Sequence, residues 1–223
     1  KNETAINTLQ NRTLGFEYVE FYLLEHLLGT AKLNKQDSTA ILHLATFNAN
    51  FKGINYVKSN LKRMCWYYLV MGNQTKASQY KAAILNNGYT INEDDKQAER
   101  FGKKQLPNSD LLSTRLYYDG GYVDLASAAI SVINVNSLTT LDLKAEYCYR
   151  KGHILEKQGT IILALKFYEA CTLFAISSDE YYGAYAAIFL GDYYLSVNDY
   201  AKACKFYNRA LSFKKNKEYT ESI

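Results

Sequence analysis

Four segments of thirteen residues repeat along the chain, and their shared columns constrain the fold more than any other feature of the sequence. Their first residues are Gly72, Gly121, Gly159 and Asn198. Glycine and asparagine tolerate the left-handed backbone of a tight turn. The sixth column is alanine throughout: Ala77, Ala126, Ala164 and Ala203. Because alanine lets two crossing helices approach closely, each segment predicts a turn followed by a tightly packed helix.

A second helix is expected ahead of each turn. Four residues before the turn stand bulky side chains that we expect to face inward: Tyr68, Tyr117, Leu155 and Tyr194. Seven residues before it stand small ones, which mark close helix contact: Cys65, Thr114, Gly152 and Gly191. Between 181 and 195 the apolar residues recur three and four positions apart, which is the period of a helix. Helix starts are predicted where an acid follows three positions after a hydroxyl residue: Thr90, Thr139 and Ser177.

The chain contains a single proline, Pro107, so long helices are permitted almost everywhere. We expect an all-α fold without β-sheet, in a single domain over residues 1–223. About five helix pairs are expected, at 13–51, 55–87, 107–134, 140–176 and 179–213, with an extra short helix or loop at 92–105. The first pair is degenerate, with helices at 16–33 and 38–51.

The column pattern resembles the tetratricopeptide repeat (TPR) family. The last unit, 184–211, carries the resemblance most clearly, in Leu190, Gly191, Tyr194, Asp199, Tyr200, Ala203, Tyr207, Ala210 and Leu211. The turn residues stand 49, 38 and 39 positions apart, whereas the usual repeat is about 34 residues, so longer helices or insertions must absorb the difference. The resemblance implies a TPR-like solenoid, a right-handed α–α superhelix.

A wider resemblance covers nearly the whole chain. The ordered motifs LLGTAKLNKQDSTAI, NFKGINYVKSNL, EDDKQAE, DGGY and EYCYRKGHILEKQG look like the C-terminal half of long TPR proteins from Bacteroidetes-type bacteria. That resemblance implies a longer parent protein, exported or associated with the cell envelope. The helix expected at 16–33 would expose Phe16, Tyr18 and Phe21. We therefore expect an upstream segment of the parent chain to pack there, or the chain to self-associate.

The sequence holds no motif for phosphate binding, nucleophilic catalysis or metal ligation, so no cofactor and no metal are expected. His26 and His43 are interpreted as packed histidines, while a ligand contact stays open for His153. The acids at 93–95 are explained by the positive end of a helix dipole.

No stretch is long and apolar enough to span a membrane. The four cysteines, Cys65, Cys148, Cys171 and Cys204, are interpreted as small buried hydrophobes.

Nucleic acid is not an expected partner. The net charge is only +4, and the basic residues near the C-terminus are explained as a solvated helix with cations at its negative end. Those residues are Lys202, Lys205, Arg209, Lys214, Lys215 and Lys217.

The repeat register of the TPR family implies which residues line the concave face of the solenoid. They are Lys62, Arg63, Trp66, Arg115, Tyr118, Tyr149, Arg150, His153, Tyr185 and Asp192. Aromatic rings and arginines supply much of the binding energy at protein interfaces. We therefore predict a non-catalytic scaffold that binds a peptide or partner protein on this face. A ligand-binding or sensory module for glycans or small acidic molecules is the alternative, and an enzyme with a site in the trough is a weaker one. Equally, the tyrosines could serve only to pack successive helices.

Overall fold

The structure is a computed structural model that describes residues 1–13, 15 and 17–213. Within these residues it contains twelve α-helices, one short 3-10 helix and no strand, so the predicted all-α class is confirmed. The chain divides into two compact units, Lys1–Leu125 and Ala126–Ile223. A single domain over the whole chain stays a prediction.

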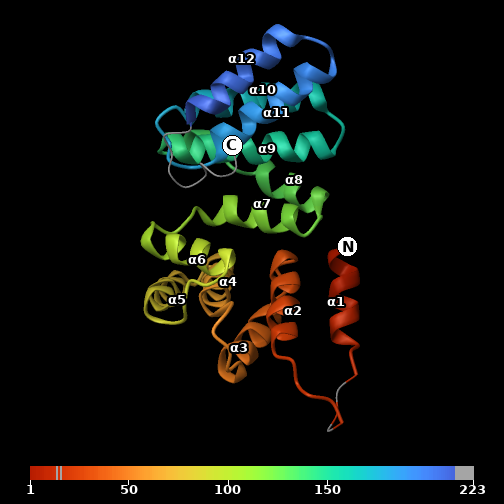
Figure 1. The fold of residues 1–223 in the computed structure, drawn as a ribbon, viewed down its shortest axis with the longest axis vertical. Coiled ribbons are helices and arrows are strands. Elements are labelled where there is room, and N and C mark those ends of the chain that lie inside the picture. Colours follow the sequence, from red (N-terminus) through yellow and green to blue (C-terminus); the bar gives the residue numbers. More distant parts are fainter. Residues whose placement is uncertain (14, 16, 214–223) are drawn as a thin grey trace. The chain divides into compact units, whose positions relative to one another are not determined.

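Unit 1 contains seven helices and the start of an eighth (Figure 1). They are α1 (Asn2–Gln10), α2 (Leu23–Asn34), α3 (Ala40–Asn50), α4 (Val57–Val70), α5 (Gln74–Asn86), α6 (Glu93–Lys103), α7 (Ser109–Asp119) and α8 (Val123–Ser131), which continues into unit 2. α2 pairs with α3, and α4 pairs with α5. α4 lies at the centre of the unit, because α2, α3, α5, α6 and α7 all contact it.

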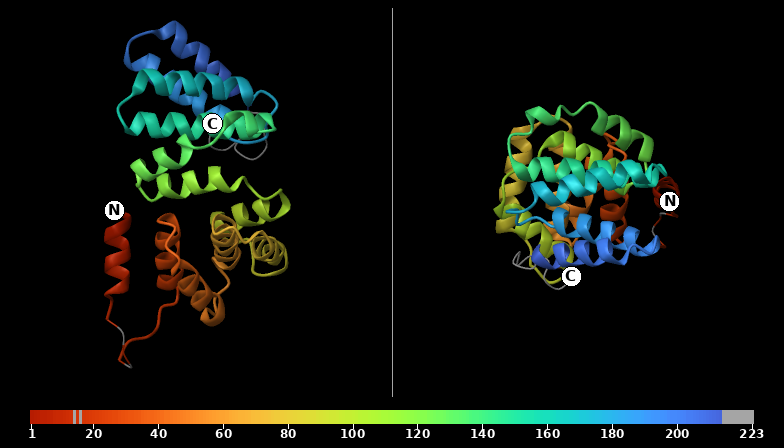
Figure 2. Two further views of the ribbon diagram at one scale, coloured as in Figure 1. Left: turned by 180° about the vertical axis from the view of Figure 1, so that it is seen from behind. Right: turned by 90° about the horizontal axis from the view of Figure 1, so that it is seen from above.

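Unit 2 contains the remaining helices in two pairs. Its elements after α8 are η1 (Val135–Ser137), α9 (Leu141–Lys157), α10 (Ile161–Phe174), α11 (Tyr182–Ser196) and α12 (Tyr200–Ser212). α9 packs along α10, and α11 packs along α12 (Figure 2). The first helices of the two pairs, α9 and α11, also contact each other. Consecutive helix pairs therefore stack within this unit, as the repeat predicts.

The four predicted turns share one backbone geometry. Their first residues all have positive φ: Gly72 at 78°, Gly121 at 80°, Gly159 at 77° and Asn198 at 60°. In each turn the next amide donates to the carbonyl five residues earlier, at 2.8–2.9 Å. This bond closes a helix that is followed by a left-handed residue, and it satisfies one of the unpaired carbonyls at the end of that helix. The predicted turn column is confirmed.

The column of alanines is buried at all four positions: Ala77, Ala126, Ala164 and Ala203. In two repeats the bulky residue ahead of the turn stacks on a ring in the helix after it. Tyr68 stacks on Tyr80 with centroids 5.3 Å apart and planes 9° apart, and Tyr194 stacks on Phe206 at 5.6 Å and 5°. Two different repeats therefore use the same ring pair to join their helices.

Two of the small residues ahead of the turns make room for a ring. A Cβ at Gly152 would lie 2.6 Å from a ring carbon of Tyr168, and a Cβ at Gly191 would lie 2.5 Å from the equivalent carbon of Tyr207. Both distances are far below van der Waals contact, so only glycine allows these helices to approach so closely. The predicted close contact is confirmed at these two positions.

The prediction for the N-terminal helix pair is wrong in its first part. α2 begins at Leu23, and Tyr18 and Phe21 lie exposed in the loop before it, while Phe16 lies outside the described residues. Residues 17–21 are exposed throughout, including the apolar side chains of Tyr18, Val19 and Phe21, so no neighbouring element provides the packing that would stabilise a helix here. Ahead of this loop, α1 lies beside α2 (Figure 1), a helix that the sequence reading did not anticipate.

Two of the three predicted helix starts are displaced by one or two residues, and the third, at Ser177, is wrong because α11 begins at Tyr182 with Tyr181 at its cap position. Asn92 rather than Thr90 caps α6, accepting from the amide of Asp95, and Thr140 rather than Thr139 caps α9. These two residues adopt the extended backbone that a cap requires immediately before the first helical residue. α6 itself occupies the segment for which a short helix or loop was expected.

Cysteine burial was predicted for all four residues and holds for three of them. Cys65, Cys148 and Cys171 are buried, whereas Cys204 is exposed on α12, and none of the four forms a disulfide. Burial raises the pKa of Cys65 to about 12 and that of Cys148 to about 11. Both thiols are therefore protonated at neutral pH and behave as small apolar side chains.

Candidate functional site

The ten residues predicted to line one binding face fall five in each unit. Unit 1 holds Lys62, Arg63, Trp66, Arg115 and Tyr118, and unit 2 holds Tyr149, Arg150, His153, Tyr185 and Asp192. The structure brings residues together within each set. A single continuous face that includes both sets stays a prediction.

In unit 1 two cations lie against the indole ring of Trp66. Lys62 Nζ, one turn earlier on α4, lies 5.1 Å from the ring centroid, and Arg115 Cζ on α7 lies 4.9 Å from it. The edge of Phe101 on α6 approaches the same ring, with centroids 6.1 Å apart. Trp66 is only 9% exposed, so these cation–π contacts are formed where water screens them little.

The three cations around Trp66 differ in the hydrogen bonds and ion pairs that they make. Arg63 donates to the carbonyl and hydroxyl of Ser59, and Arg115 Nε donates to Asp119 Oδ2 at 3.3 Å. Lys62 is 7% exposed, and within the described part of the chain its ammonium makes no hydrogen bond or ion pair. Lys62 is therefore a buried cation without a counter-ion in contact.

Burial and like charge lower the pKa of Lys62 to about 7. Loss of solvation contributes most, followed by the nearby charges of Arg63 and Arg115. Asp94 and Asp95 on α6 act in the opposite direction and do not compensate. Near neutral pH this lysine is consequently close to half protonated.

Asp95 fixes α6 against the start of α4. Its Oδ2 accepts from the amide of Tyr56 at 2.7 Å, and its Oδ1 accepts from the amide of Ser59 at 2.9 Å. The fully buried carboxylate thus caps a neighbouring helix, although it stands in the first turn of its own. The helix dipole explains why acids occur at 93–95, but the sequence did not reveal that Asp95 caps α4.

His26 belongs to a buried polar chain between α2, α3 and α4. Its Nδ1 donates to Asn60 Oδ1 at 3.0 Å, since Asn60 Nδ2 is itself committed to the carbonyl of Leu44 at 2.9 Å. Burial, followed by the charge of Arg63, lowers the pKa of His26 to about 4. His26 is a neutral packing residue, as the sequence reading proposed.

In unit 2 a group of half-buried rings gathers on α9 and at the start of α11. Tyr149 lies 5.6 Å from Tyr181 and 5.4 Å from Tyr182, and Tyr181 lies 5.6 Å from Tyr185. His153 continues the group along α9, with its ring 4.4 Å from Tyr149. We call Tyr149, His153, Tyr181 and Tyr185 the α9–α11 aromatic face.

Arg150 differs from the expectation that it is offered to a partner. It is 8% exposed, and its Nε donates to Glu146 Oε1 at 2.8 Å, one turn earlier on α9. Burial lowers the pKa of Arg150, but Glu146 and then Tyr182 more than offset this and hold it above its ordinary value. The ion pair engages Arg150 within its own helix, and its guanidinium lies 5.7 Å from the ring centroid of Tyr182. The Glu146 to Arg150 spacing of four residues was the signal in the sequence.

His153 is neutral at physiological pH. Burial, followed by the charges of Arg150 and Lys157, lowers its pKa to about 4. Its ring lies edge-on to Tyr168 and Phe189, at centroid distances of 5.7 and 4.8 Å. A ligand contact through its aromatic ring therefore fits this site better than one through a charged imidazolium.

Asp192 contacts the neighbouring helix of its own repeat rather than the α9–α11 aromatic face. Asp192 is exposed and accepts from the hydroxyl of Tyr207 at 2.7 Å, which ties α11 to α12. Tyr118 is half-buried on α7. Asp192 thus has a packing role within its own repeat.

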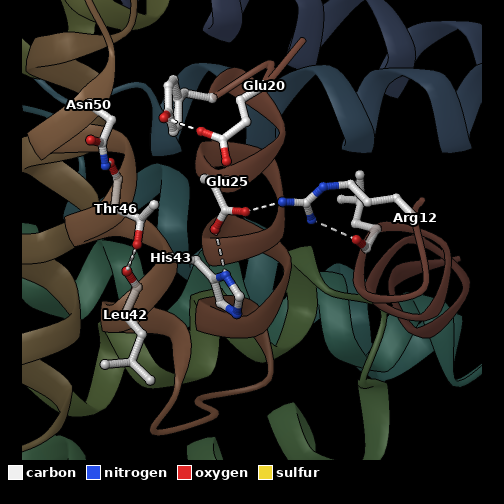
Figure 3. Close-up of polar contacts among 9 residues, drawn as sticks. Arg12, Glu20, Glu25, Leu42, His43, Thr46 and Asn50 are labelled. Carbon is white, nitrogen blue, oxygen red and sulfur yellow. Dashed lines mark hydrogen bonds and ion pairs between the residues drawn. The ribbon is translucent and has the colours of Figure 1, made fainter. Parts of the chain in front are cut away.

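A polar cluster that the sequence reading missed joins α2 and α3 to the chain after α1 (Figure 3). Glu25 accepts from Arg12 through one carboxylate oxygen and from His43 Nδ1 through the other, the latter at 2.7 Å. Burial alone would raise the pKa of Glu25, but the hydrogen bonds from His43 and Arg12 hold it below its ordinary value. Arg12 follows a helix that was not anticipated, so no sequence signal pointed to this cluster.

The basic residues of α12 are engaged within the chain. Lys202 Nζ lies 3.0 Å from Asp199 Oδ2, Lys205 Nζ lies 5.7 Å from the ring centroid of Phe206, and Arg209 donates to the carbonyl of Thr172 at 2.9 Å. The remaining lysines of that group, 214, 215 and 217, lie outside the described residues. Within the described ranges, no cluster of three potential metal ligands occurs, and no helix is long and apolar enough to cross a membrane.

The comparisons with known proteins identify the repeats of unit 2. Residues 145–174 and 184–217 match the tetratricopeptide repeat family. The two matches correspond to the helix pairs α9–α10 and α11–α12, and the second begins at the residue where the sequence resemblance was strongest. Tetratricopeptide repeats generally mediate protein–protein interaction and are typically non-enzymatic. Comparison with curated proteins gave no match, and comparison with solved structures gave none either.

Proposed function

We propose that this protein is a non-catalytic scaffold that binds a peptide or a partner protein on the α9–α11 aromatic face. The observation that carries the proposal is the position of these rings. They lie half-buried on the first helices of two consecutive helix pairs that match the tetratricopeptide repeat.

The chemistry of the face suits recognition of an apolar or aromatic side chain. Tyrosine offers a large rigid area at little cost in side-chain entropy, together with a hydroxyl that hydrogen-bonds. The buried Glu146–Arg150 pair lies on α9 next to Tyr149, with Arg150 Cζ 5.7 Å from the Tyr182 ring. Tyr182 in turn packs against Tyr149 and Tyr181, so we expect the ion pair to limit the motion of these rings and to reduce the entropy lost on binding.

The test compares two tyrosines in the same unit. A photoreactive phenylalanine analogue at position 185 captures the partner, which is then purified, and its Kd is measured by calorimetry for wild type, Tyr185→Ala and Tyr200→Ala. Tyr200 lies on α12 and is 61% exposed, so it serves as the control. We expect Tyr185→Ala to weaken binding by about tenfold or more and Tyr200→Ala to leave it unchanged. Equal effects of both substitutions would rule out the aromatic face as the binding surface.

The cellular location of the partner and the extent of the parent protein are inferred from the resemblance to long TPR proteins of Bacteroidetes-type bacteria. We propose that the partner belongs to a bacterial cell envelope and that the chain is part of a longer protein whose upstream segment packs against the exposed loop at Tyr18 and Phe21. Self-association through that loop is the alternative, and light scattering distinguishes the two: the chain by itself stays monomeric in the first case and dimerises with concentration in the second.

A second candidate function is a ligand-binding module for small acidic molecules. The observation that favours it lies in unit 1, where Lys62 is a buried cation without a counter-ion in contact.

A further inference from the structure

Two buried donors in unit 1 lack an acceptor, and they lie on successive turns of α4. The ammonium of Lys62 makes no hydrogen bond or ion pair to any described residue, and the indole Nε1 of Trp66 is buried without a hydrogen-bond partner. A buried charge and a buried N–H are each costly when unpaired. Their occurrence together, four residues apart on one helix, has no explanation in the packing of α4.

The surrounding groups concentrate positive charge at this point. Arg63 from α4 and Arg115 from α7 add to Lys62, while Asp94 and Asp95 from α6 offset them only in part. Asp95 is committed to two backbone amides and Asp119 to Arg115. An additional negative charge would therefore be stabilised here.

We propose that Lys62 and Trp66 form a binding site for a single carboxylate group. A carboxylate has two acceptor oxygens and one negative charge, which match one ammonium and one indole N–H. Recognition of a phosphate usually uses several charged or forked donors, and here Arg63 and Arg115 already donate to Ser59 and Asp119. The inference rests on the second candidate function and is independent of the α9–α11 aromatic face.

Lys62 is not sealed off completely, since 7% of its surface stays exposed. The carboxylate could come from a free organic acid or from an acidic side chain of a partner. Acetate represents the first source, and acetyl-glutamate amide represents the second. Inorganic phosphate tests the competing chemistry.

Trp66 is the only tryptophan in the chain, so its indole signal reports on binding at this site. Its indole N–H gives one cross-peak in a nitrogen–proton correlation spectrum, and this peak is followed while each probe is added to the full chain at constant ionic strength. We expect a saturable shift with acetate or acetyl-glutamate amide and none with chloride. The tighter of the two carboxylates identifies the source.

Three variants make the result specific. Lys62→Gln should weaken carboxylate binding by roughly tenfold or more, and Lys62→Arg should retain most of it. Lys76→Gln is the matched control, because Lys76 is an exposed lysine that lies 5.0 Å from the Tyr68 ring centroid in the same unit.

The proposal is overturned if the shift is absent or follows chloride equally, if phosphate binds more tightly than both carboxylates, or if Lys62→Gln binds like wild type. None of these outcomes affects partner binding through Tyr185.

Discussion

At the scale of single residues, Gly152 and Gly191 show how the repeat brings its paired helices together. Each faces a tyrosine ring of the following helix at a distance that excludes even a methyl group. The two glycines occupy the same column of the repeat, and so do the two tyrosines. Substitution at either glycine therefore probes the packing of α9 on α10 or of α11 on α12.

We expect Gly191→Ala to lower the free energy of unfolding by about 1–3 kcal/mol, because the added methyl overpacks against Tyr207. Alanine has the higher helix propensity, so the sign of the effect separates packing from backbone preference. Urea unfolding followed by circular dichroism measures it. In Gly191→Ala/Tyr207→Ala the clash is absent, and the double variant should lose less than the sum of the single ones. A stabilised Gly191→Ala would show that the helices are farther apart.

We expect Lys62 to make the free energy of unfolding of unit 1 increase with pH. Its pKa is about 7 in the folded chain and has an ordinary value of 10.5, so between these values the unfolded chain binds more protons at this position. The free energy of unfolding therefore rises with pH through that window, by up to ~1.4 kcal/mol per pH unit from this group. Comparing wild type with Lys62→Met by urea unfolding, read from Trp66 fluorescence in carboxylate-free buffer, isolates the effect. A difference between the two proteins that stays constant from pH 7 to 10 would contradict the assignment.

At the scale of elements, the sequence predicted the turns and the helix pairs around them better than it predicted the ends of the chain's helices. Four aligned segments made the positive-φ column visible, because only a few residue types tolerate that backbone. The helix α1 and the loop before α2 were missed, since a single copy of a segment has nothing to be aligned with. Asp95 could not have been identified as the cap of α4, because that contact joins two helices only in the folded chain.

We expect the turn at Gly159 to accept asparagine but not alanine. Nothing lies within 4 Å of a Cβ at this glycine, so the cost of substitution comes from the backbone at φ 77°. Gly159→Ala should lower the free energy of unfolding by about 1–2 kcal/mol. Gly159→Asn should cost clearly less, because Asn198 holds the same position of the last turn at φ 60°. Equal losses for the two variants, measured by thermal unfolding, would show that the turn has another conformation.

Asp95→Ala should release the first turn of α4. Loss of the cap, together with the two buried amides left without an acceptor, should cost about 2 kcal/mol or more. Hydrogen exchange at the amides of Tyr56 and Ser59 should accelerate in this variant. Asp94→Ala is the control, because Asp94 makes no hydrogen bond or ion pair to a described residue. Unchanged exchange at both amides in Asp95→Ala would show that the carboxylate does not cap α4.

At the scale of the whole molecule, the candidate sites divide between the two units. Unit 2 carries the matched repeats and the aromatic face, and unit 1 carries the cationic group around Trp66. The register of the repeat identified most residues of both groups. It could not tell an exposed arginine from one that a neighbouring acid neutralises, as at Arg150, because a register fixes the face of a helix and not the partners on it.

The most direct test of partner binding through the α9–α11 aromatic face is an experimental structure of the chain with the partner captured at position 185. The account predicts that partner side chains pack against Tyr149, Tyr181 and Tyr185. A partner seated on α10 and α12, with those three rings uncovered, would contradict it.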